Sequence, residues 1–279
     1  MNLQQWLNRT WHQRLHQPFR LAYTTFGRGT QPILLLHGLA CDRTFWNPLI
    51  AQLDPEQYTV IVPDLLGHGQ SPSPGYINYS SADQAQAVAA LCGQLGVDKC
   101  VVVGHSMGCL VATRLATQQP SLVERLLLYE PPLFADVPEF RTHQRRRAFY
   151  FGIYERIAQI PPGGVLMTRM LSRVAKKWAR HLANEQTWLP IERSLRNSIM
   201  QPHGFEELRD TTVLTDIVHG RFDVVVPRSG LKKMLAHNKN IRFYRTTDRH
   251  GMSKLSARHL AKIIASPIQP ADNEGVEEE

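Results

Sequence analysis

The segment Gly104–Gly108 has the pattern Gly-His-Ser-Met-Gly, in which a serine stands between two glycines. It follows the apolar run Val101–Val103 and precedes a helical pattern, so we expect Ser106 at a sharp turn between a strand and a helix. The glycines would avoid clashes with the neighbouring strand and helix in this strained geometry. The turn would hold the hydroxyl group above the edge of a sheet, at the positive end of a helix dipole. The pattern therefore predicts a nucleophile at Ser106.

A serine hydroxyl is a weak nucleophile until a base takes its proton, and that base must be oriented by an acid. His250 is the predicted base and Asp223 the predicted acid, because each directly follows a strand-like run. In open α/β sheets, ligands bind at the carboxyl ends of the strands, so both side chains would reach the same edge. Glu130, after the strand that follows the nucleophile helix, is the rival acid, and Asp248 is a weaker rival beside the base.

Two backbone N–H groups are predicted to stabilise a negative oxygen that forms during such a reaction. One belongs to Leu39, after the turn His37-Gly38 that ends an apolar strand, and the other belongs to Met107, directly after the serine. Gly38 would let the backbone come close, whereas His37 is expected to make a structural hydrogen bond. The glycine-spaced loop Asp64–Ser71 lacks the spacing of a phosphate-binding loop and is interpreted as a structural turn. The chain has no metal-ligand spacing, so we predict neither a metal nor a cofactor.

The elements that would position these groups alternate between strand-like and helical patterns. Strands are predicted at 19–26, 33–36, 58–62, 100–103, 123–129, 213–218 and 241–244, and helices at 82–95, 109–118, 228–236 and 256–265. The unbroken apolar strands suit a parallel sheet covered by helices on both faces. Between 133 and 209 only helical patterns occur, at 141–160, 165–182 and 189–200. We therefore predict an α/β core at 1–132 and 211–271, an inserted helical cap at 133–210, and a disordered acidic tail at 272–279.

The composition excludes several classes of protein. The chain has 279 residues, of which 43% are hydrophobic and 20% charged, and its formal net charge is +8. It lacks an apolar run of about 18 residues that could span a membrane, and its first residues lack the apolar core of a secretory signal. The four cysteines show no metal or redox spacing, which favours reduced, mostly buried thiols in a cytoplasmic protein. No nucleic-acid-binding signature accompanies the positive charge, so we expect no nucleic-acid partner.

Together, these motifs resemble the α/β-hydrolase superfamily from Arg20 to Ala265. The resemblance rests on four segments, which are His37-Gly38, Asp64–Ser71, Gly104–Gly108 and Gly220–Asp223. It implies an eight-stranded, mostly parallel sheet with a helical cap between strands six and seven. It also implies a set of roles: nucleophile for Ser106, general base for His250, orienting acid for Asp223, and oxyanion donors for Leu39 and Met107. One departure is that the first residues resemble an amphipathic helix where a strand is usual, which is compatible with one strand fewer.

The N-terminal helical pattern carries Leu3, Trp6, Leu7 and Leu15. A helix of this kind can dock on a membrane surface. We instead expect it to pack on the domain, with no stable insertion into a membrane and at most a weak association with its surface.

The predicted cap is expected to select the substrate, because it would cover the nucleophile. It is basic, with 13 lysines and arginines against 8 acidic residues between 133 and 210. This charge is typical of helices that have a solvated basic face and an apolar underside. Attraction of an anionic substrate stays open as an alternative. We expect a small-molecule substrate to contact five aromatic residues, Trp46, Phe149, Tyr150, Tyr154 and Trp178.

The predicted reaction is hydrolysis of a carboxylic ester through an acyl-enzyme intermediate. A serine at position 106 argues against the dehalogenase and epoxide hydrolase branches of the superfamily, which use an aspartate there. Two alternatives stay open: C–C bond hydrolysis or acyl transfer by the same three residues, and a receptor or ligand-binding protein that keeps the fold without turnover. The presence of all three polar residues and both oxyanion turns speaks against the receptor.

Overall fold

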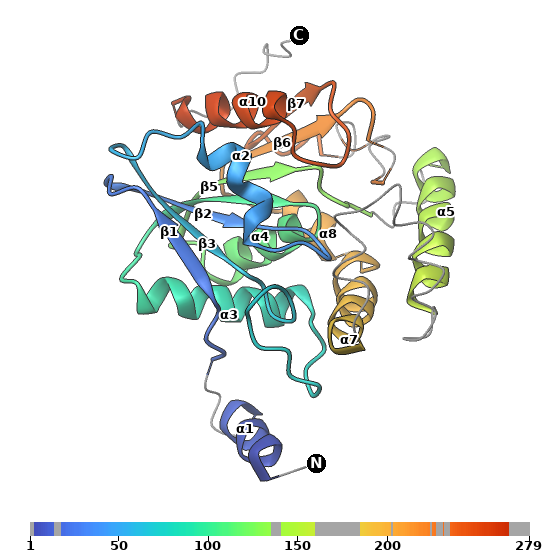
Figure 1. Ribbon diagram of the computed structural model, residues 1–279. Coiled ribbons are helices and arrows are strands. Elements are labelled where there is room, and N and C mark those ends of the chain that lie inside the picture. Colours follow the sequence, from blue (N-terminus) through green and yellow to red (C-terminus); the bar gives the residue numbers. More distant parts are fainter. Residues whose placement is uncertain are drawn as a thin grey trace.

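The computed structural model describes residues 3–13, 18–134, 141–159, 185–201, 203–223, 225–226, 231 and 235–267. Its centre is a seven-stranded sheet in the order β1-β3-β2-β4-β5-β6-β7 (Figure 1). The strands are β1 (Tyr23–Phe26), β2 (Gln31–Leu36), β3 (Tyr58–Pro63), β4 (Cys100–His105), β5 (Val123–Tyr129), β6 (Thr215–Gly220) and β7 (Ile241–Thr246). β1 pairs antiparallel with β3, and the other neighbours pair in parallel. The prediction of a mostly parallel sheet is therefore confirmed, and the described residues form one strand fewer than the resemblance implies.

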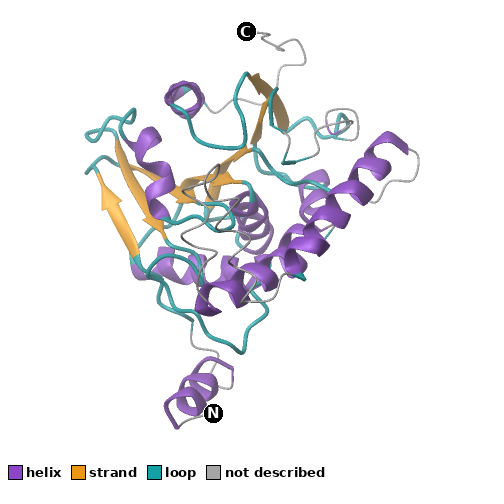
Figure 2. Cartoon of the chain, turned by 45° about the vertical axis from the view of Figure 1, so that its right-hand side comes forward, coloured by secondary structure: helices purple, strands orange, loops and turns teal. Residues whose placement is uncertain are grey.

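Both faces of the sheet are apolar and covered by helices (Figures 1 and 2). Along β2, Leu34 and Leu36 belong to one hydrophobic core, whereas Ile33 and Leu35 belong to the other. Successive residues of a strand point to opposite faces, so an unbroken apolar run buries both. The first core includes α3 (Ser81–Gln94) and α4 (Met107–Gln118), and the second includes α2 (Asn47–Ile50) and α10 (Lys254–Ala265).

Side-chain caps begin two of these helices. The Oγ of Ser80 accepts a hydrogen bond from the N–H of Asp83, and the carboxylate of Asp83 accepts one from the N–H of Ser80. Ser253 caps α10 in the same way, because its Oγ accepts from the N–H of Ser256 at 3.0 Å. Gly96 has a left-handed φ of +67°, which suits the end of a helix. The helices predicted at 82–95 and 256–265 are thus confirmed, with small shifts at their ends.

The described chain between β5 and β6 is mostly helical. It contains α5 (Arg141–Ala158), α7 (Glu185–Ser194), the π-helical segment η3 (Leu195–Ile199) and α8 (His203–Arg209). The helices predicted at 141–160 and 189–200 fall within this block. The helix predicted at 165–182, most of that at 228–236 and the tail at 272–279 lie outside the described residues. The division into core and cap stays a prediction.

Polar contacts hold this helical block together and attach it to the core. Arg196 in η3 forms an ion pair with Glu155 in α5, with 2.7 Å between Nη1 and Oε1. Arg193 in α7 donates to the carbonyl oxygens of Gly75 and Ile77, in the loop before α3. These contacts fix α7 beside the loop that follows β3.

The N-terminal helix α1 (Leu3–Gln13) contacts the domain through His12. The ring of His12 stacks on that of Phe19, with 3.8 Å between their centroids. Trp6, Leu7 and Trp11, in contrast, are 48%, 47% and 53% exposed. The expectation that the apolar side of this helix packs on the domain is therefore wrong for Trp6 and Leu7, whereas the side chains of Leu3 and Leu15 lie outside the described residues.

All four cysteines are free, which agrees with the predicted reduced thiols. Cys92, Cys100 and Cys109 are buried, and the first two form a hydrogen bond with each other. Among the described residues, no helix combines the length and the apolar character needed to cross a membrane.

Three charged residues are buried or partly buried where β5, β6 and β7 meet. Asp216 on β6 is 0% exposed, and its carboxylate contacts Arg125 on β5 and Arg242 on β7. The Nε of Arg125 lies 2.6 Å from Oδ2 of Asp216, and its Nη1 donates to the carbonyl oxygen of Ser266 at 3.0 Å. These contacts tie the C-terminal strand and helix to the centre of the sheet.

We expect Asp216→Ala to lower the free energy of unfolding by about 3–5 kcal/mol, because Arg125 would keep a buried charge without its partner. The matched control is Glu56→Ala, which breaks the exposed pair between Glu56 and Arg28 and should change stability by about 1 kcal/mol or less. Urea denaturation of both variants measures the difference. Equal losses in the two variants would contradict the importance of the buried contacts.

Candidate active site

Ser106 stands at the junction of β4 and α4, in the turn that the sequence predicts. Its φ of +50° and ψ of −120° form a strained backbone conformation for a residue with a side chain. The flanking glycines are required by close packing. A Cβ on Gly108 would lie 2.2 Å from the carbonyl oxygen of Leu36, and one on Gly104 would lie 2.6 Å from that of Gly108. The turn is therefore held against β2, and the side chain of Ser106 is directed away from these contacts.

The structure brings Ser106, Asp223 and His250 together. The Nε2 of His250 lies 3.0 Å from the Oγ of Ser106, and its Nδ1 lies 2.7 Å from Oδ2 of Asp223. All three residues are largely buried, with exposed fractions of 7%, 6% and 8% for Ser106, Asp223 and His250. This is the geometry that a serine nucleophile, a base and an orienting acid require.

The surroundings of Asp223 keep its carboxyl group ionised. Burial raises the pKa of Asp223, but hydrogen bonds to His250 and Glu130 lower it by more, and the resulting pKa is about 2. The N–H of Val225 also donates to Oδ1 of Asp223 at 2.6 Å. A carboxylate hydrogen-bonded to Nδ1 fixes the ring of His250 with Nε2 directed at the serine.

Glu130, the rival acid, lies behind Asp223 rather than against the histidine base. It follows β5, is fully buried and has a left-handed φ of +54°. Its Oε1 accepts a hydrogen bond from the N–H of Gly220 at 2.6 Å, and its Oε2 lies 3.2 Å from Nδ1 of His219. Burial, together with the hydrogen bond to Asp223 and its negative charge, raises the pKa of Glu130 to about 10. Glu130 therefore carries a proton and donates it to the hydrogen bond with the ionised Asp223.

Asp248, the weaker rival, takes part in the start of α10. Its Oδ1 accepts a hydrogen bond from the Oγ of Ser253 at 2.8 Å. Ser253 is the residue that caps this helix. The carboxylate thus fixes the loop that carries His250.

Two residues that the sequence analysis did not assign hold the backbone around His250. The Nε2–H of His105 donates to the carbonyl oxygen of His250 at 2.8 Å, and the hydroxyl of Tyr129 donates to that of Gly251 at 2.9 Å. Burial lowers the pKa of His105 well below its usual value, so the ring is neutral and can donate from Nε2. Their positions in the sequence could have indicated this role, because His105 directly precedes Ser106 and Tyr129 ends the next strand.

The predicted oxyanion donors lie at the expected turns. A Cβ on Gly38 would come within 3.1 Å of the Cβ of Ser106, so the backbone before Leu39 passes close to the serine. Met107 is the first residue of α4, where a backbone N–H has no partner within the helix. The role of both N–H groups stays a prediction. His37 makes the structural hydrogen bond expected of it, because its Nε2 accepts from the N–H of Leu65 at 3.0 Å.

The loop Asp64–Ser71 forms the structural turn that the sequence predicts. The carboxylate of Asp64 accepts hydrogen bonds from the N–H groups of Arg43 and Gln70, both at 2.8 Å. Gly69 has a φ of +53°, and a Cβ there would lie 2.2 Å from the carboxyl group of Asp64. The glycine spacing therefore serves the turn itself.

Among the five aromatic residues predicted to contact substrate, those that the structure describes differ in their exposure to solvent. Trp46 is 0% exposed and packs edge-on against Phe45 in the core, so the expectation that it contacts substrate is wrong. Phe149 is 65% exposed on α5, and Tyr154 is buried, with its hydroxyl donating to the carbonyl oxygen of Val225 at 2.7 Å. Tyr150 is half-buried between them, and Trp178 lies outside the described residues.

A cavity of about 550 Å³ lies beside His250. Among the described residues, Phe222, Val225, Arg249 and His250 line it. Tyr154 reaches this region through its hydrogen bond to Val225. The cavity thus lies where the described part of α5 approaches the triad.

The fold and this site define an α/β hydrolase. Residues 31–187 match the alpha/beta hydrolase fold family, and the chain belongs to that family. A thermophilic esterase from Thermogutta terrifontis has a similar structure, with a TM-score of 0.63 and 25% identity over 87% of this chain and 89% of the esterase. The epoxide hydrolase CorEH, at 19% identity, shares the fold with a TM-score of 0.68 over 88% of this chain and 92% of its own.

Two relatives with higher sequence identity match shorter segments of the chain. The uncharacterized protein Rv2715 of Mycobacterium tuberculosis is 44% identical over 110 residues, which are 39% of this chain and 31% of that protein. The sn-1-specific diacylglycerol lipase ABHD11 of Danio rerio is 35% identical over 193 residues, which are 67% of this chain and 55% of the lipase. The chain therefore matches about a third of the first of these proteins and about half of the second.

The protonated state of Glu130 predicts a pH dependence of stability. The unfolded chain loses this proton near the ordinary pKa of 4.5, whereas the folded chain keeps it until a pKa of about 10. Between these values the unfolded state binds fewer protons, so Glu130 makes the free energy of unfolding fall as the pH rises, by up to about 1.4 kcal/mol per unit. We expect Glu130→Gln to remove this part of the slope, as measured by urea denaturation at several pH values between about 6 and 9.

The control for this prediction is Glu56→Gln, at an exposed carboxyl group, which should leave the pH slope of the wild type unchanged. Parallel slopes for Glu130→Gln and the wild type would show that Glu130 is ionised in the folded chain.

Proposed function

We propose that this α/β hydrolase cleaves carboxylic esters through Ser106, His250 and Asp223. The observation that carries the proposal is the pair of hydrogen bonds on one imidazole ring. Its Nε2 lies 3.0 Å from the oxygen of Ser106, and its Nδ1 lies 2.7 Å from the carboxylate of Asp223. A histidine held in this way can take a proton from the serine and give it to a leaving group.

In the first half of the reaction, Nε2 of His250 takes the proton as Oγ of Ser106 attacks the ester carbonyl carbon. The carbonyl electrons move to oxygen, and the N–H groups of Leu39 and Met107 donate to that anion. The bond from carbon to the alkoxy oxygen then breaks, and the alcohol leaves with the proton from His250. In the second half, water attacks the acyl-enzyme with His250 as its base, and the acid and free serine are released.

The electrostatics of the site support this cycle. Asp223, with a pKa of about 2, stays ionised when His250 becomes positive, so an ion pair forms at the moment of proton transfer. Glu130, with a pKa of about 10, adds no second negative charge behind it. The base therefore faces one anion, and the neighbouring carboxyl group contributes a hydrogen bond.

The names of two relatives agree with an ester substrate. The Thermogutta terrifontis protein is described as an esterase, and the Danio rerio relative as a diacylglycerol lipase. The half-buried and buried tyrosines Tyr150 and Tyr154 on α5 offer apolar surface for an acyl group near the cavity beside His250. We propose contact with the substrate for these two tyrosines.

We expect a fluorophosphonate probe to label Ser106 and nitrophenyl esters of graded acyl length to be hydrolysed. Ser106→Ala should lose the label and at least about 10³-fold in kcat, because it removes the oxygen that lies 3.0 Å from Nε2 of His250. Ser121→Ala, at an exposed serine after α4, is the control and should keep both. Mass spectrometry of the labelled peptide identifies the site. A wild-type protein that neither reacts with the probe nor hydrolyses any ester would favour the binding-protein alternative.

Replacing each of the two carboxyl groups by an amide distinguishes the roles of Asp223 and Glu130. Asp223→Asn should lower kcat by about 10⁴-fold, because the imidazole loses the anion that orients it. Glu130→Gln keeps a neutral side chain that can donate to Asp223, so kcat and the acidic limb of the pH profile of kcat/KM should change little. Steady-state kinetics across the pH range measure both. The reverse pattern, with near-normal Asp223→Asn and an inactive Glu130→Gln, would assign the acid to Glu130.

A further inference from the structure

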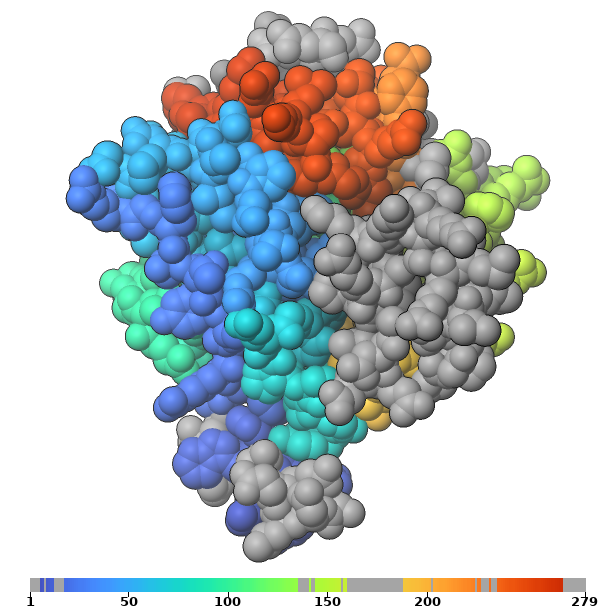
Figure 3. All heavy atoms as spheres, viewed as in Figure 1, coloured from blue at the N-terminus to red at the C-terminus, as the bar shows by residue number. Residues whose placement is uncertain are grey.

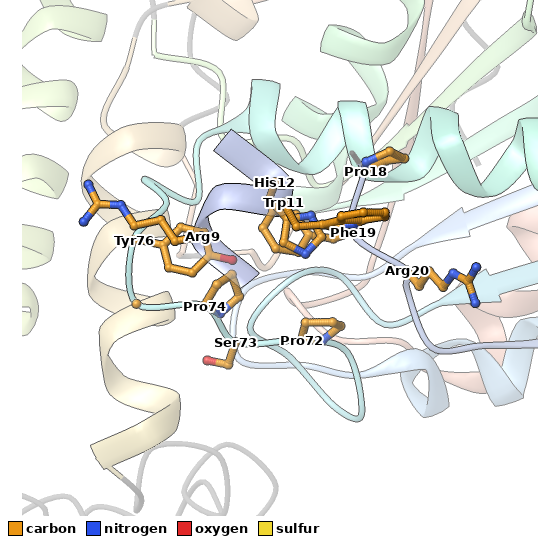
Figure 4. A pocket seen from close by; sticks show the side chains of 11 residues that line it. Arg9, Trp11, His12, Pro18, Phe19, Arg20, Pro72, Ser73, Pro74 and Tyr76 are labelled. Atoms are coloured by element: carbon orange, nitrogen blue, oxygen red, sulfur yellow. The ribbon is translucent and has the colours of Figure 1, made fainter. Parts of the chain in front are cut away.

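A second cavity, of about 920 Å³, lies beside α1 and contains none of the three proposed catalytic residues in its lining. Aromatic side chains, including Trp11, Phe19 and Tyr76, line it together with Arg9 and Arg20. Figure 4 shows the two arginines at opposite ends of the cavity, with the rings of Trp11 and Phe19 between them. No acidic residue occurs in the described lining. The cavity thus joins an apolar floor to two cationic ends.

The same helix exposes three large apolar side chains, Trp6, Leu7 and Trp11, each about half open to solvent. With about 100° between successive residues, they occupy an arc of about 140° on one side of the helix. Figures 1 and 2 both place α1 at the lower end of the molecule, and Figure 3 shows its described side chains at the outer surface there. The tryptophans are therefore accessible to a large partner.

The chain segment that carries this helix contains basic residues and no acidic residue. Residues 1–41 contain four arginines and neither aspartate nor glutamate, and the first acidic residue of the chain is Asp42. Arg9 and Arg20 are both exposed, and Arg9 lies on the helix that carries the tryptophans. Tryptophan rings bind in the headgroup region of a bilayer, and basic residues beside them attract anionic lipids.

We propose that α1 and the adjoining loop at residues 72–76 form a docking surface for an anionic phospholipid bilayer. Trp6, Leu7 and Trp11 enter the headgroup region, while Arg9 and Arg20 pair with lipid phosphates. One helix of 11 residues buries little apolar area, so the association is reversible. This surface is independent of the proposed ester hydrolysis, because none of its residues belongs to the site around Ser106.

A second copy of the chain suits the surface less well. In a two-fold dimer through α1, the same surface would meet itself, and Arg9 and Arg20 would face arginines. Neither α1 nor the described lining of the cavity supplies an acidic side chain to offset that repulsion. An anionic bilayer provides the negative charge that this part of the protein lacks.

The test is sedimentation of the full-length chain with vesicles of phosphatidylcholine alone and with one third phosphatidylglycerol. We expect binding to the anionic vesicles, weakening at high salt, and a blue shift of tryptophan fluorescence. Trp6→Ala/Trp11→Ala should weaken binding by more than about tenfold and abolish the shift, because it removes both inserting rings. Arg9→Gln should weaken binding by about fivefold, the contribution of one arginine near an anionic surface.

A matched pair of double variants distinguishes binding through this surface from non-specific binding of the protein to vesicles. Leu7→Ala/Arg9→Gln removes one exposed apolar and one basic side chain from α1, and Leu255→Ala/Arg258→Gln removes the same from α10. Only the first should lose vesicle binding, with thermal melting showing that both are folded. Three results would overturn the proposal: no binding to anionic vesicles, equal binding by both double variants, or a concentration-dependent dimer that Trp6→Ala/Trp11→Ala converts to a monomer.

Discussion

The left-handed backbone at Ser106 is the constraint on which the candidate site depends. A residue with a side chain adopts such a conformation only where the surrounding structure leaves no relaxed alternative. Here the alternative is blocked because Gly104 and Gly108 press β4 and α4 against each other and against Leu36 of β2. β2 and β4 are buried on both faces, so the strain at the serine is maintained by the hydrophobic core of the whole sheet. The position of one hydroxyl group thus depends on packing far beyond the turn.

Buried polar groups continue this arrangement from strand to strand. Glu130, after β5, joins the N–H of Gly220 at the end of β6 to the carboxylate of Asp223. Asp223 holds one side of the ring of His250, and His105 at the end of β4 holds its backbone. Glu130, Asp223 and His105 each have at least one hydrogen-bond partner, as buried polar side chains generally do. His250 is therefore held by contacts to β4, which carries Ser106, and to the ends of β5 and β6.

Much of the fold and the proximity of Ser106, Asp223 and His250 could be predicted because they depend on local pattern and chain order. Apolar runs identify the inner strands, and carboxyl ends of parallel strands meet at one edge, which brings Ser106 and His250 together across 144 residues. The burial of single aromatic residues could not be predicted, because the sequence around Trp46 is equally compatible with a place in the core and with a place in the wall of a pocket. Two further features depend on distances between segments, which a sequence pattern does not give. They are the direction in which the apolar side of α1 points and the protonation of Glu130.

The hydrogen bonds that hold the loop around His250 have a consequence for the order in which the site forms during synthesis. Its carbonyl anchor on His105 and the neighbouring anchor on Tyr129 belong to strands synthesised more than a hundred residues earlier. The turn at Ser106 can therefore form on the ribosome while β7 and the loop that carries His250 are still missing. In the proposed reaction, Ser106 gains its base only when β7 and α10 join the sheet.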